Sequence, residues 1–285
     1  MHGLTSLTRK RATRWPALVG VALLMVAQAG AQESKQGPVR RLPEKETRRI
    51  IVQGDVEPPP IPVEEIVKRV TQKEDELKRA HDAYNYQFSA RIQEFPADGS
   101  TAGEMQMTSE IYRKADGQRY GRILKEDPGQ LRFFEFFRED LQELAALPMF
   151  LLTSDQLPRY ELTYAGRQPL DELTAYIFRL RPKRLERRER QFEGVLWVDD
   201  HDFAIVKTYG KWVAEVIPDA KEMPFQMFET YRQLIGEKYW FPAYIRSEDT
   251  VKAQAGEARI RLTIRYTDYQ LAPAAPGPAP PPPKQ

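Results

Sequence analysis

The stretch FEGVLWVDDHDFAIVKTYGKW, residues Phe192–Trp212, decides the fold. Two apolar runs of strand length lie on either side of the polar turn Asp199–Asp202, which reads DDHD. Apolar runs of this length joined by a short polar turn predict a β-hairpin. Similar runs recur along the chain, so we interpret the hairpin as one unit of a larger antiparallel sheet.

Ten stretches predict strands, because apolar and polar residues alternate in them or because a short apolar run lies between turn residues. The clearest is ARIRLTIRYTDY, where Ile260, Leu262 and Ile264 alternate with polar residues. Short polar turns join most of the stretches, which favours an antiparallel meander, and a sheet of this size tends to curl. The ten predicted strands are residues 84–92, 104–114, 117–126, 159–166, 173–183, 191–200, 203–212, 225–235, 238–251 and 258–269.

Two stretches have helical spacing instead. Apolar residues recur at steps of three and four from Val63 to Tyr84, directly after Pro62, which suits a helix start. A second helix is expected within Arg138–Thr153, broken at Pro148. The predicted fold class is therefore α+β: a large curled antiparallel sheet whose concave face is covered by helices.

The ends of the chain differ in composition from its middle. Residues 1–31 have a basic head, an apolar run and the ending Ala29-Gly30-Ala31, which predicts a cleaved secretory signal peptide. A membrane anchor is the alternative, but the clearly apolar part, Ala17–Ala27, is shorter than the roughly 20 residues that a span needs. Residues 32–62 are charged and proline-rich and predict a disordered leader, the domain covers 63–270, and the proline-rich 271–285 predicts an extended tail.

Charge and cysteine content exclude some classes of function. Cleavage after Ala31 leaves 39 basic and 41 acidic residues, a net charge of about −2, which is unfavourable for nucleic-acid binding. The chain has no cysteine, so we expect no disulfide and no lipid attachment at a cysteine. Together with the signal peptide, these features predict an exported protein that is not lipid-anchored, and the resemblance described below implies the periplasm.

Candidate chemistry is sparse. The DDHD turn offers three carboxylates and His201, but neighbouring residues at a hairpin tip diverge, and Asp also satisfies turn geometry, so a solvated turn is favoured over a weak cation site or catalysis. The other histidine of the mature chain, His81, lies at a helix end. No nucleotide-binding or nucleophile-elbow motif is present, and we expect no cofactor, no metal and no catalytic residue. The basic run Arg181–Arg190 is either a solvated loop or a site for lipid phosphates or a membrane surface.

Large aromatic residues fall on most of the predicted strands. A curled sheet with covering helices either fills its interior with such side chains or leaves an apolar cavity for a ligand. The sequence does not choose between these two outcomes.

The order of elements resembles the outer-membrane lipoprotein-sorting family, a LolA/LolB-like superfold that also includes RseB-type sensors. The resemblance covers about Val63–Gln270 and is carried by the G-x-L-W-V-D … A-I-V-K hairpin, by W-F-P at Trp240–Pro242 and by Y-x-D-Y at Tyr266–Tyr269. It implies an open, unclosed β-barrel that binds acyl chains of lipids or lipoproteins in the periplasm, and it carries over no catalytic residue.

We therefore expect a carrier or chaperone that shields acyl chains, with an inner-membrane exporter or an outer-membrane acceptor as its protein partner. A sensor or regulatory module of the same fold, acting through protein–protein contacts, is the alternative, and a hydrolase is the third and least favoured. The residues predicted to line the apolar cavity are Phe88, Met105, Met107, Ile111, Phe133, Phe134, Phe136, Phe137, Leu141 and Leu144.

Overall fold

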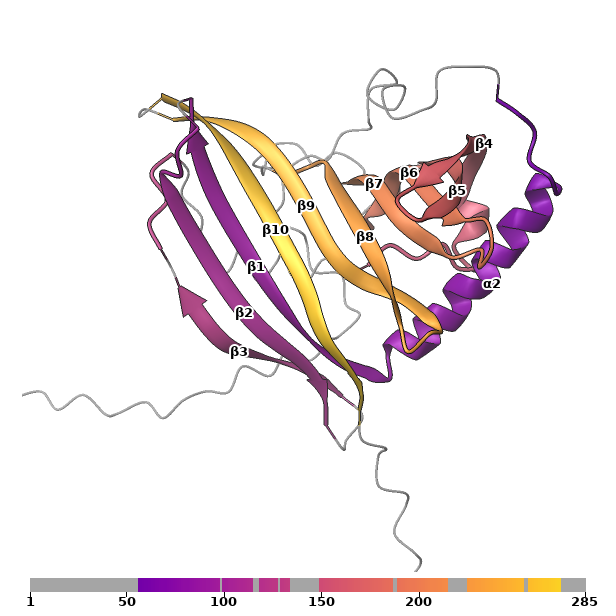
Figure 1. Ribbon diagram of the computed structural model, residues 1–285, viewed down its shortest axis with the longest axis horizontal. Coiled ribbons are helices and arrows are strands. Elements are labelled where there is room, and N and C mark those ends of the chain that lie inside the picture. The colour runs from indigo at the N-terminus through magenta and orange to yellow at the C-terminus, as the bar shows by residue number, and fades with distance from the viewer. Residues whose placement is uncertain are drawn as a thin grey trace, which may run out of the picture.

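The structure is a computed structural model that describes residues 56–97, 99–114, 118–127, 129–133, 149–186, 189–214, 225–253 and 256–272. These residues form one ten-stranded antiparallel sheet, strongly curled, with a helix lying across one end (Figure 1). The elements are α2 (Val63–His81), β1 (Tyr84–Pro96), β2 (Gly103–Arg113), β3 (Arg119–Asp127), the 3-10 turn η1 (Leu157–Arg159), β4 (Tyr160–Leu170), β5 (Leu173–Pro182), β6 (Gln191–Asp199), β7 (Ile205–Val213), β8 (Phe228–Ile235), β9 (Tyr239–Ala253) and β10 (Gly256–Leu271).

The strand order is β3-β2-β1-β10-β9-β8-β7-β6-β5-β4. Strands β4 to β10 form the predicted meander, and the first three strands join it where β1 pairs with β10, with Phe88 opposite Tyr266 and Ala90 opposite Ile264. Strands β3 and β4 are the two edges and do not pair with each other, so the sheet is open rather than a closed barrel. The predicted fold class is confirmed.

Helix α2 begins where it was predicted and ends earlier. Its last residue is His81 rather than Tyr84, because Tyr84 already pairs with Leu271 as the first residue of β1. The second predicted helix lies mostly outside the described residues, and its last part, Met149–Thr153, is not helical. No helix among the described residues combines the length and apolar character that crossing a membrane requires.

Two apolar clusters cover the concave face of the sheet. The β1–β10 cluster contains Phe88, Met107 and Ile264, with neighbours from β2 and β9. The α2 cluster packs Ile66 and Val70 of the helix on residues of β4 to β7, among them Phe178, Phe192 and Leu196. Burying a side chain of this size stabilises the fold by about 1.5–3 kcal/mol. The helix therefore lies on the concave side, as the sequence predicted.

A third cluster lies on the opposite, convex face of β5 to β7 and includes Ile177, Val195 and Trp197. Strands β5 to β7 are thus apolar on both faces, which explains why the stretch Phe192–Trp212 reads as nearly continuous apolar runs. The alternating strands, such as β10, have one buried and one polar face.

Two glycines face each other at the centre of the β6–β7 pair. A Cβ atom on Gly210 would overlap the backbone of Glu193 and lie 2.6 Å from Cζ of Phe192, and one on Gly194 would lie 2.7 Å from Cα of Gly210. The missing side chains leave room for the Phe192 ring, which stacks on Phe150 at a centroid distance of 4.7 Å. This pair of glycines lets the cover of the concave face lie close to the strands.

We expect Gly210→Ala to lower the free energy of unfolding by about 1–3 kcal/mol, because the new methyl group displaces Phe192 or the backbone. Gly121→Ala on edge strand β3 is the control, since its Cβ would meet only Cδ1 of Ile111 at 3.4 Å. Urea unfolding measures both, and equal effects of the two substitutions would contradict the close packing described here.

Candidate functional site: a cavity on the concave face

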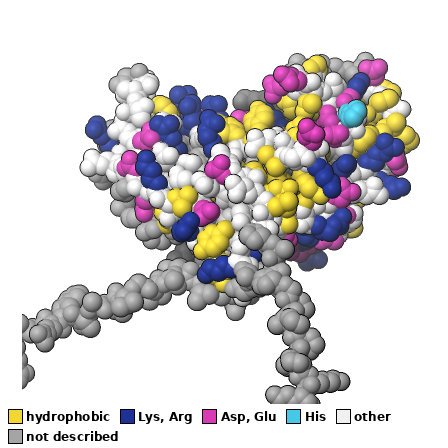
Figure 2. All heavy atoms as spheres, turned by 60° about the horizontal axis from the view of Figure 1, so that its bottom comes forward, with side chains coloured by type: hydrophobic (Ala, Val, Ile, Leu, Met, Phe, Trp, Pro, Cys, Tyr) yellow, Lys and Arg dark blue, Asp and Glu magenta, His cyan; other side chains and the backbone are white. Residues whose placement is uncertain are grey.

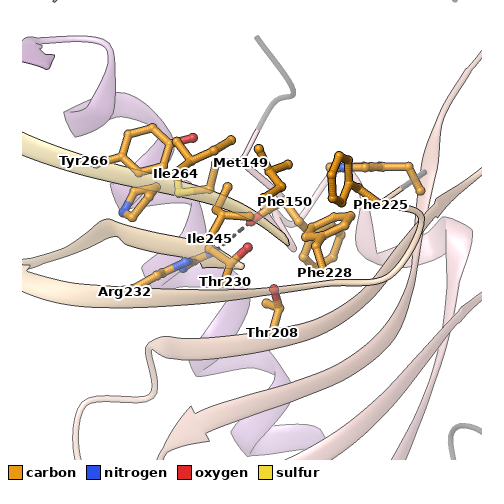
Figure 3. A pocket seen from close by; sticks show the side chains of 13 residues that line it. Met149, Phe150, Thr208, Phe225, Phe228, Thr230, Arg232, Ile245, Ile264 and Tyr266 are labelled. Carbon is orange, nitrogen blue, oxygen red and sulfur yellow. Dashed lines mark hydrogen bonds between the residues drawn. The ribbon is translucent and has the colours of Figure 1, made fainter. Parts of the chain in front are cut away.

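A cavity lies where the two concave clusters meet, over β7 to β10 (Figure 3). Its wall is mainly apolar and includes Trp212 and Phe228 next to the α2 cluster and Ile245 and Ile264 next to the β1–β10 cluster. Four of its side chains are polar: Thr208, Thr230, Arg232 and Tyr266. An apolar wall with a few placed polar groups is typical of a site for a small apolar ligand.

The cavity is narrow in this structure. Its volume is about 30 Å³, against the 10–15 Å³ that one water molecule requires by the same measure. It holds one or two waters but no acyl chain. A chain can therefore enter only if part of the wall moves.

One wall residue, Arg232, belongs to a buried ion pair with Glu74 of α2. Arg232 Nη1 lies 2.6 Å from Oε1 of Glu74, and both side chains are 1% exposed. Arg232 Nη2 also donates to the carbonyl oxygen of Phe150 at 2.7 Å, as the dashed line in Figure 3 shows. One guanidinium thus joins α2, β8 and the segment that follows residue 149. Three parts of the chain that are distant in sequence meet at this point.

The segment Phe150–Asp155, here called the strap, is tied to α2 along its length. The backbone N–H of Ser154 donates to Asp75 at 3.1 Å and its hydroxyl donates to the same carboxylate at 2.5 Å. Lys78 pairs with Asp155 at 3.8 Å. Phe150 and Leu152 point into the α2 cluster and are buried. The strap and α2 are therefore connected to each other, and Phe150 of the strap lines the cavity.

Two polar groups of the cavity lack partners. Arg232 Nε is buried and has no hydrogen-bond partner. The hydroxyl of Tyr266 has none among the described residues either, and burial raises the pKa of Tyr266 well above its ordinary value. Both groups are hydrogen-bond donors at neutral pH.

The structure places the predicted lining residues beside the cavity rather than in its wall. Phe88, Met105 and Met107 are buried in the β1–β10 cluster, and Ile111 packs against that cluster half-buried. Phe133 is half-buried and its backbone N–H donates to Glu94 at 2.9 Å. None of these five described residues lines the cavity. The other five, Phe134, Phe136, Phe137, Leu141 and Leu144, lie outside the described residues.

Sequence reasoning missed the ion pair. Glu74 lies in the apolar stripe of α2 at helical spacing from Ile66, Val70 and Leu77. Arg232 follows Phe228 and Thr230 at the period of two that places all three on the concave face. A charged residue in an apolar stripe is rarely buried unless it is paired. Glu74 and Arg232 are two such residues of opposite charge, and this was the feature of the sequence from which a buried ion pair could have been predicted.

The DDHD residues form the turn between β6 and β7. Asp199 accepts a hydrogen bond from the backbone N–H of Asp202 at 2.7 Å, and Asp202 accepts one from Nε1 of Trp240 at 3.3 Å. Asp200 pairs with Arg167. One ligand atom from each of Asp199, His201 and Asp202 lies within 4.8 Å of the others, so a cation could be held there. Burial raises the pKa of Asp199, whereas hydrogen bonding to His201 lowers that of Asp202.

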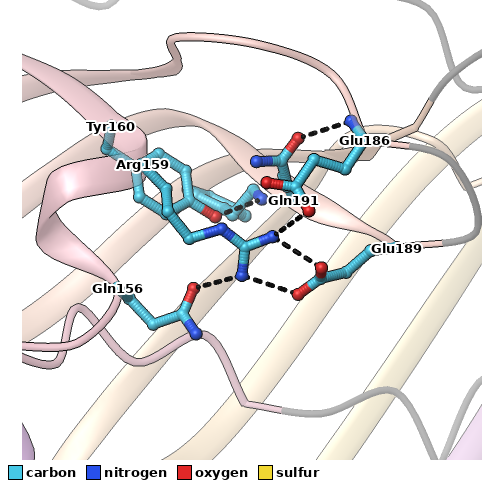
Figure 4. Close-up of polar contacts among 7 residues, drawn as sticks. Gln156, Arg159, Tyr160, Glu186, Glu189 and Gln191 are labelled. Carbon is cyan, nitrogen blue, oxygen red and sulfur yellow. Dashed lines mark hydrogen bonds and ion pairs between the residues drawn. The ribbon is translucent and has the colours of Figure 1, made fainter.

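Two acidic residues of the basic run Arg181–Arg190 bind a cation outside the run (Figure 4). Arg159 at the end of η1 donates two hydrogen bonds to Glu189, at 2.7 and 2.6 Å, and pairs with Glu186 at 2.9 Å. Lys183 donates to the carbonyl oxygen of Pro158 at 3.0 Å. Glu186 and Glu189 are thus bound by Arg159, a cation outside the run, while Arg181 within the run lies 3.4 Å from Glu193. On the face shown in Figure 2, basic and acidic side chains are likewise interspersed.

Comparison with known proteins found similarity to solved structures alone: no protein-family model and no curated protein matches the chain. A DUF1329 family protein from Desulfovibrio piger is 13% identical, with a TM-score of 0.31 over 74% of this chain and 93% of the other. The LolA superfamily protein NE2245 from Nitrosomonas europaea is 12% identical, with a TM-score of 0.31 over 75% and 94%.

The Pseudomonas aeruginosa MucA/MucB complex also matches, with 10% identity and a TM-score of 0.21 over 71% of this chain and 100% of the other. The matches include a LolA superfamily protein and MucB, an RseB-type protein, which are the kinds that the sequence resembles. At these TM-scores the likenesses carry no functional conclusion. The proposals below rest on the residues of the chain itself.

We expect Glu74→Ala to lower the free energy of unfolding by about 3–5 kcal/mol, because it leaves the Arg232 guanidinium buried without its counter-charge. Glu65→Ala is the control, since it removes an exposed pair with Arg69 on the same helix and should have a much smaller effect. Urea unfolding measures both. Similar small effects would show that Glu74 is not the counter-charge of a buried cation.

The Arg159–Glu189 pair predicts a pH dependence. Hydrogen bonding to Arg159 holds the pKa of Glu189 below its ordinary value, so the pair stabilises the fold above the unfolded-state pKa of about 4.3 and loses this effect as the pH falls through the folded-state pKa. Glu189 is 48% exposed, so screening limits the effect to less than about 1 kcal/mol. The stability difference between the wild type and Glu189→Gln should shrink between about pH 6 and pH 3; a constant difference would contradict the assignment.

Proposed function

We propose that this is a periplasmic protein that binds acyl chains of a lipid or lipoprotein on the concave face of its sheet and carries them between partners. The observation that supports this most directly is the cavity between two apolar clusters, walled by Trp212, Phe228, Ile245 and Ile264. The export signal expected in residues 1–31 supports the compartment. Burial of the chain would supply about 0.8 kcal/mol for each CH2 group removed from water.

Entry of a chain requires movement of the cover. The strap is not part of the sheet: it is held by its hydrogen bonds to α2, by Arg232 and by the packing of Phe150 and Leu152. The strands below it are held by continuous ladders on both sides. The strap, which lines the cavity through Phe150, is therefore the element whose displacement would widen the cavity at the lowest cost in hydrogen bonds.

Mass spectrometry of organic extracts is the first test of this proposal. The protein is purified from a periplasmic fraction without detergent and extracted. We expect a phospholipid or an acylated peptide in near-stoichiometric amount. A protein that yields no lipid and takes up no fluorescent fatty acyl ester would contradict the proposal.

Tryptophan quenching locates the ligand. Trp212 lies in the cavity wall, whereas Trp197 belongs to the convex cluster and Trp240 packs against it. A fatty acyl chain brominated near its end should quench the fluorescence of Trp212 on binding. The quenching should disappear in Trp212→Phe, and quenching that persists there would place the chain elsewhere.

A charged residue in the wall should abolish binding. Ile245→Lys places an ammonium group against the bound chain, and we expect at least a tenfold loss of affinity, because desolvating an unpaired charge costs more than about 1.4 kcal/mol. Leu234→Lys is the matched control, since Leu234 is 42% exposed on neighbouring strand β8 and does not line the cavity. Equal affinities of the two variants would contradict the proposed site.

The narrowness of the cavity favours a second candidate, a regulatory module that acts through protein–protein contacts. In that case the side chains fill the interior and no chain enters. Absence of both lipid extraction and Trp212 quenching, together with capture of a stable protein complex from the periplasm, would support this candidate.

A further inference from the structure

The cavity has a polar and an apolar end. Figure 3 shows Arg232 and Tyr266 toward one end of the cavity and Phe225 and Phe228 toward the other. At the polar end, Arg232 Nε and the hydroxyl of Tyr266 are donors without partners among the described residues. Leaving a buried donor such as Arg232 Nε without an acceptor is unfavourable. These donors match a ligand that brings a hydrogen-bond acceptor.

The charge of the site limits what this acceptor can be. The Arg232 guanidinium is neutralised by Glu74, and no other charged side chain lines the cavity within the described part of the chain. A carboxylate bound here would add a negative charge without a free counter-charge, which is costly in a dry site. An uncharged carbonyl oxygen accepts the same hydrogen bonds without this cost.

We infer that the cavity recognises the ester or amide carbonyl of an acyl group and discriminates against the free fatty acid. This inference rests on the proposed acyl-chain site and adds the chemistry of its head. The chain would lie toward Phe225 and Phe228, and the carbonyl oxygen toward Arg232 and Tyr266. An ester corresponds to a glycerolipid, and an amide to an N-acylated peptide terminus.

The test is a competition series against the brominated chain, read as recovery of Trp212 fluorescence. The competitors have one chain length and differ only in the head: the methyl ester, the N-methyl amide, the carboxylate at neutral pH and the plain hydrocarbon. We expect the ester or the amide to compete about tenfold better than the hydrocarbon and the carboxylate, as one charge-assisted hydrogen bond predicts. Whether the ester or the amide competes better identifies the source of the carbonyl.

Tyr266→Phe tests the polar end without altering the ion pair. It removes only the hydroxyl, so the protein should fold, and the advantage of the ester over the hydrocarbon should fall severalfold. Tyr244→Phe is the matched control, because Tyr244 contacts Arg265 and Tyr231 and does not line the cavity. An unchanged advantage in Tyr266→Phe would overturn the assignment of this donor.

Glu74→Gln tests the charge argument. It keeps the shape of the side chain but leaves the Arg232 charge uncompensated, so the preference should reverse and the carboxylate should compete better than the ester. Glu65→Gln on the exposed side of α2 should keep the wild-type preference. If Glu74→Gln is too unstable to assay, the Nε–H resonance of Arg232 in wild-type protein replaces it: the ester should shift this resonance and the hydrocarbon should not.

The outcomes separate this inference from the proposed function. If no competitor and no brominated chain affects Trp212, the acyl-chain site itself is wrong. If all four heads compete equally, or if the carboxylate competes best in the wild type, the acyl-chain site stands and the carbonyl inference is overturned.

Discussion

The pair of Glu74 and Arg232 is the interaction on which the concave side of this protein depends. The two side chains are almost fully buried, and Arg232 also holds the carbonyl oxygen of Phe150. A buried ion pair is weak evidence for net stability, because apolar side chains of similar size often serve as well. Its geometric effect is more specific: it sets how α2 and the strap lie over β8.

The ion pair lies on the concave face of the open sheet. The sheet curls enough to enclose apolar surface, and its edge strands β3 and β4 remain apart. On one half the concave face is covered by α2 and the strap, and Gly194 and Gly210 allow Phe192 and Phe150 to lie close to the strands. The other half carries the β1–β10 cluster. The cavity lies at the boundary between the α2 cluster and the β1–β10 cluster, because the side chains of two separately packed clusters do not fill all the space between them.

Much of the fold was predictable from the sequence, because it follows from local patterns. Alternation along β10 and the apolar runs around Asp199–Asp202 predicted strands, and the spacing of Ile66, Val70 and Leu77 predicted the helix. The pairing of β1 with β10 was not predicted, since nothing in either strand specifies its neighbour. The cavity wall was not predicted for a similar reason. Met107 and Ile264 are both apolar residues on the inward face of a strand, and the sequence does not distinguish them. Only the curvature of the sheet determines that Ile264 lines the cavity and Met107 does not.

The pairing of β1 with β10 also determines when the sheet can be completed. These strands lie at opposite ends of the domain in sequence, and their ladder is continued by the hydrogen bond from Ala272 to Ala83. During synthesis β1, β2 and β3 are made first, and β1 keeps an unpaired edge until the last strand is made. Contacts so distant in sequence form slowly, and unpaired strand edges promote aggregation. A folding factor that shields this early three-stranded sheet would therefore raise the yield of native protein more than one that acts on β4 to β10.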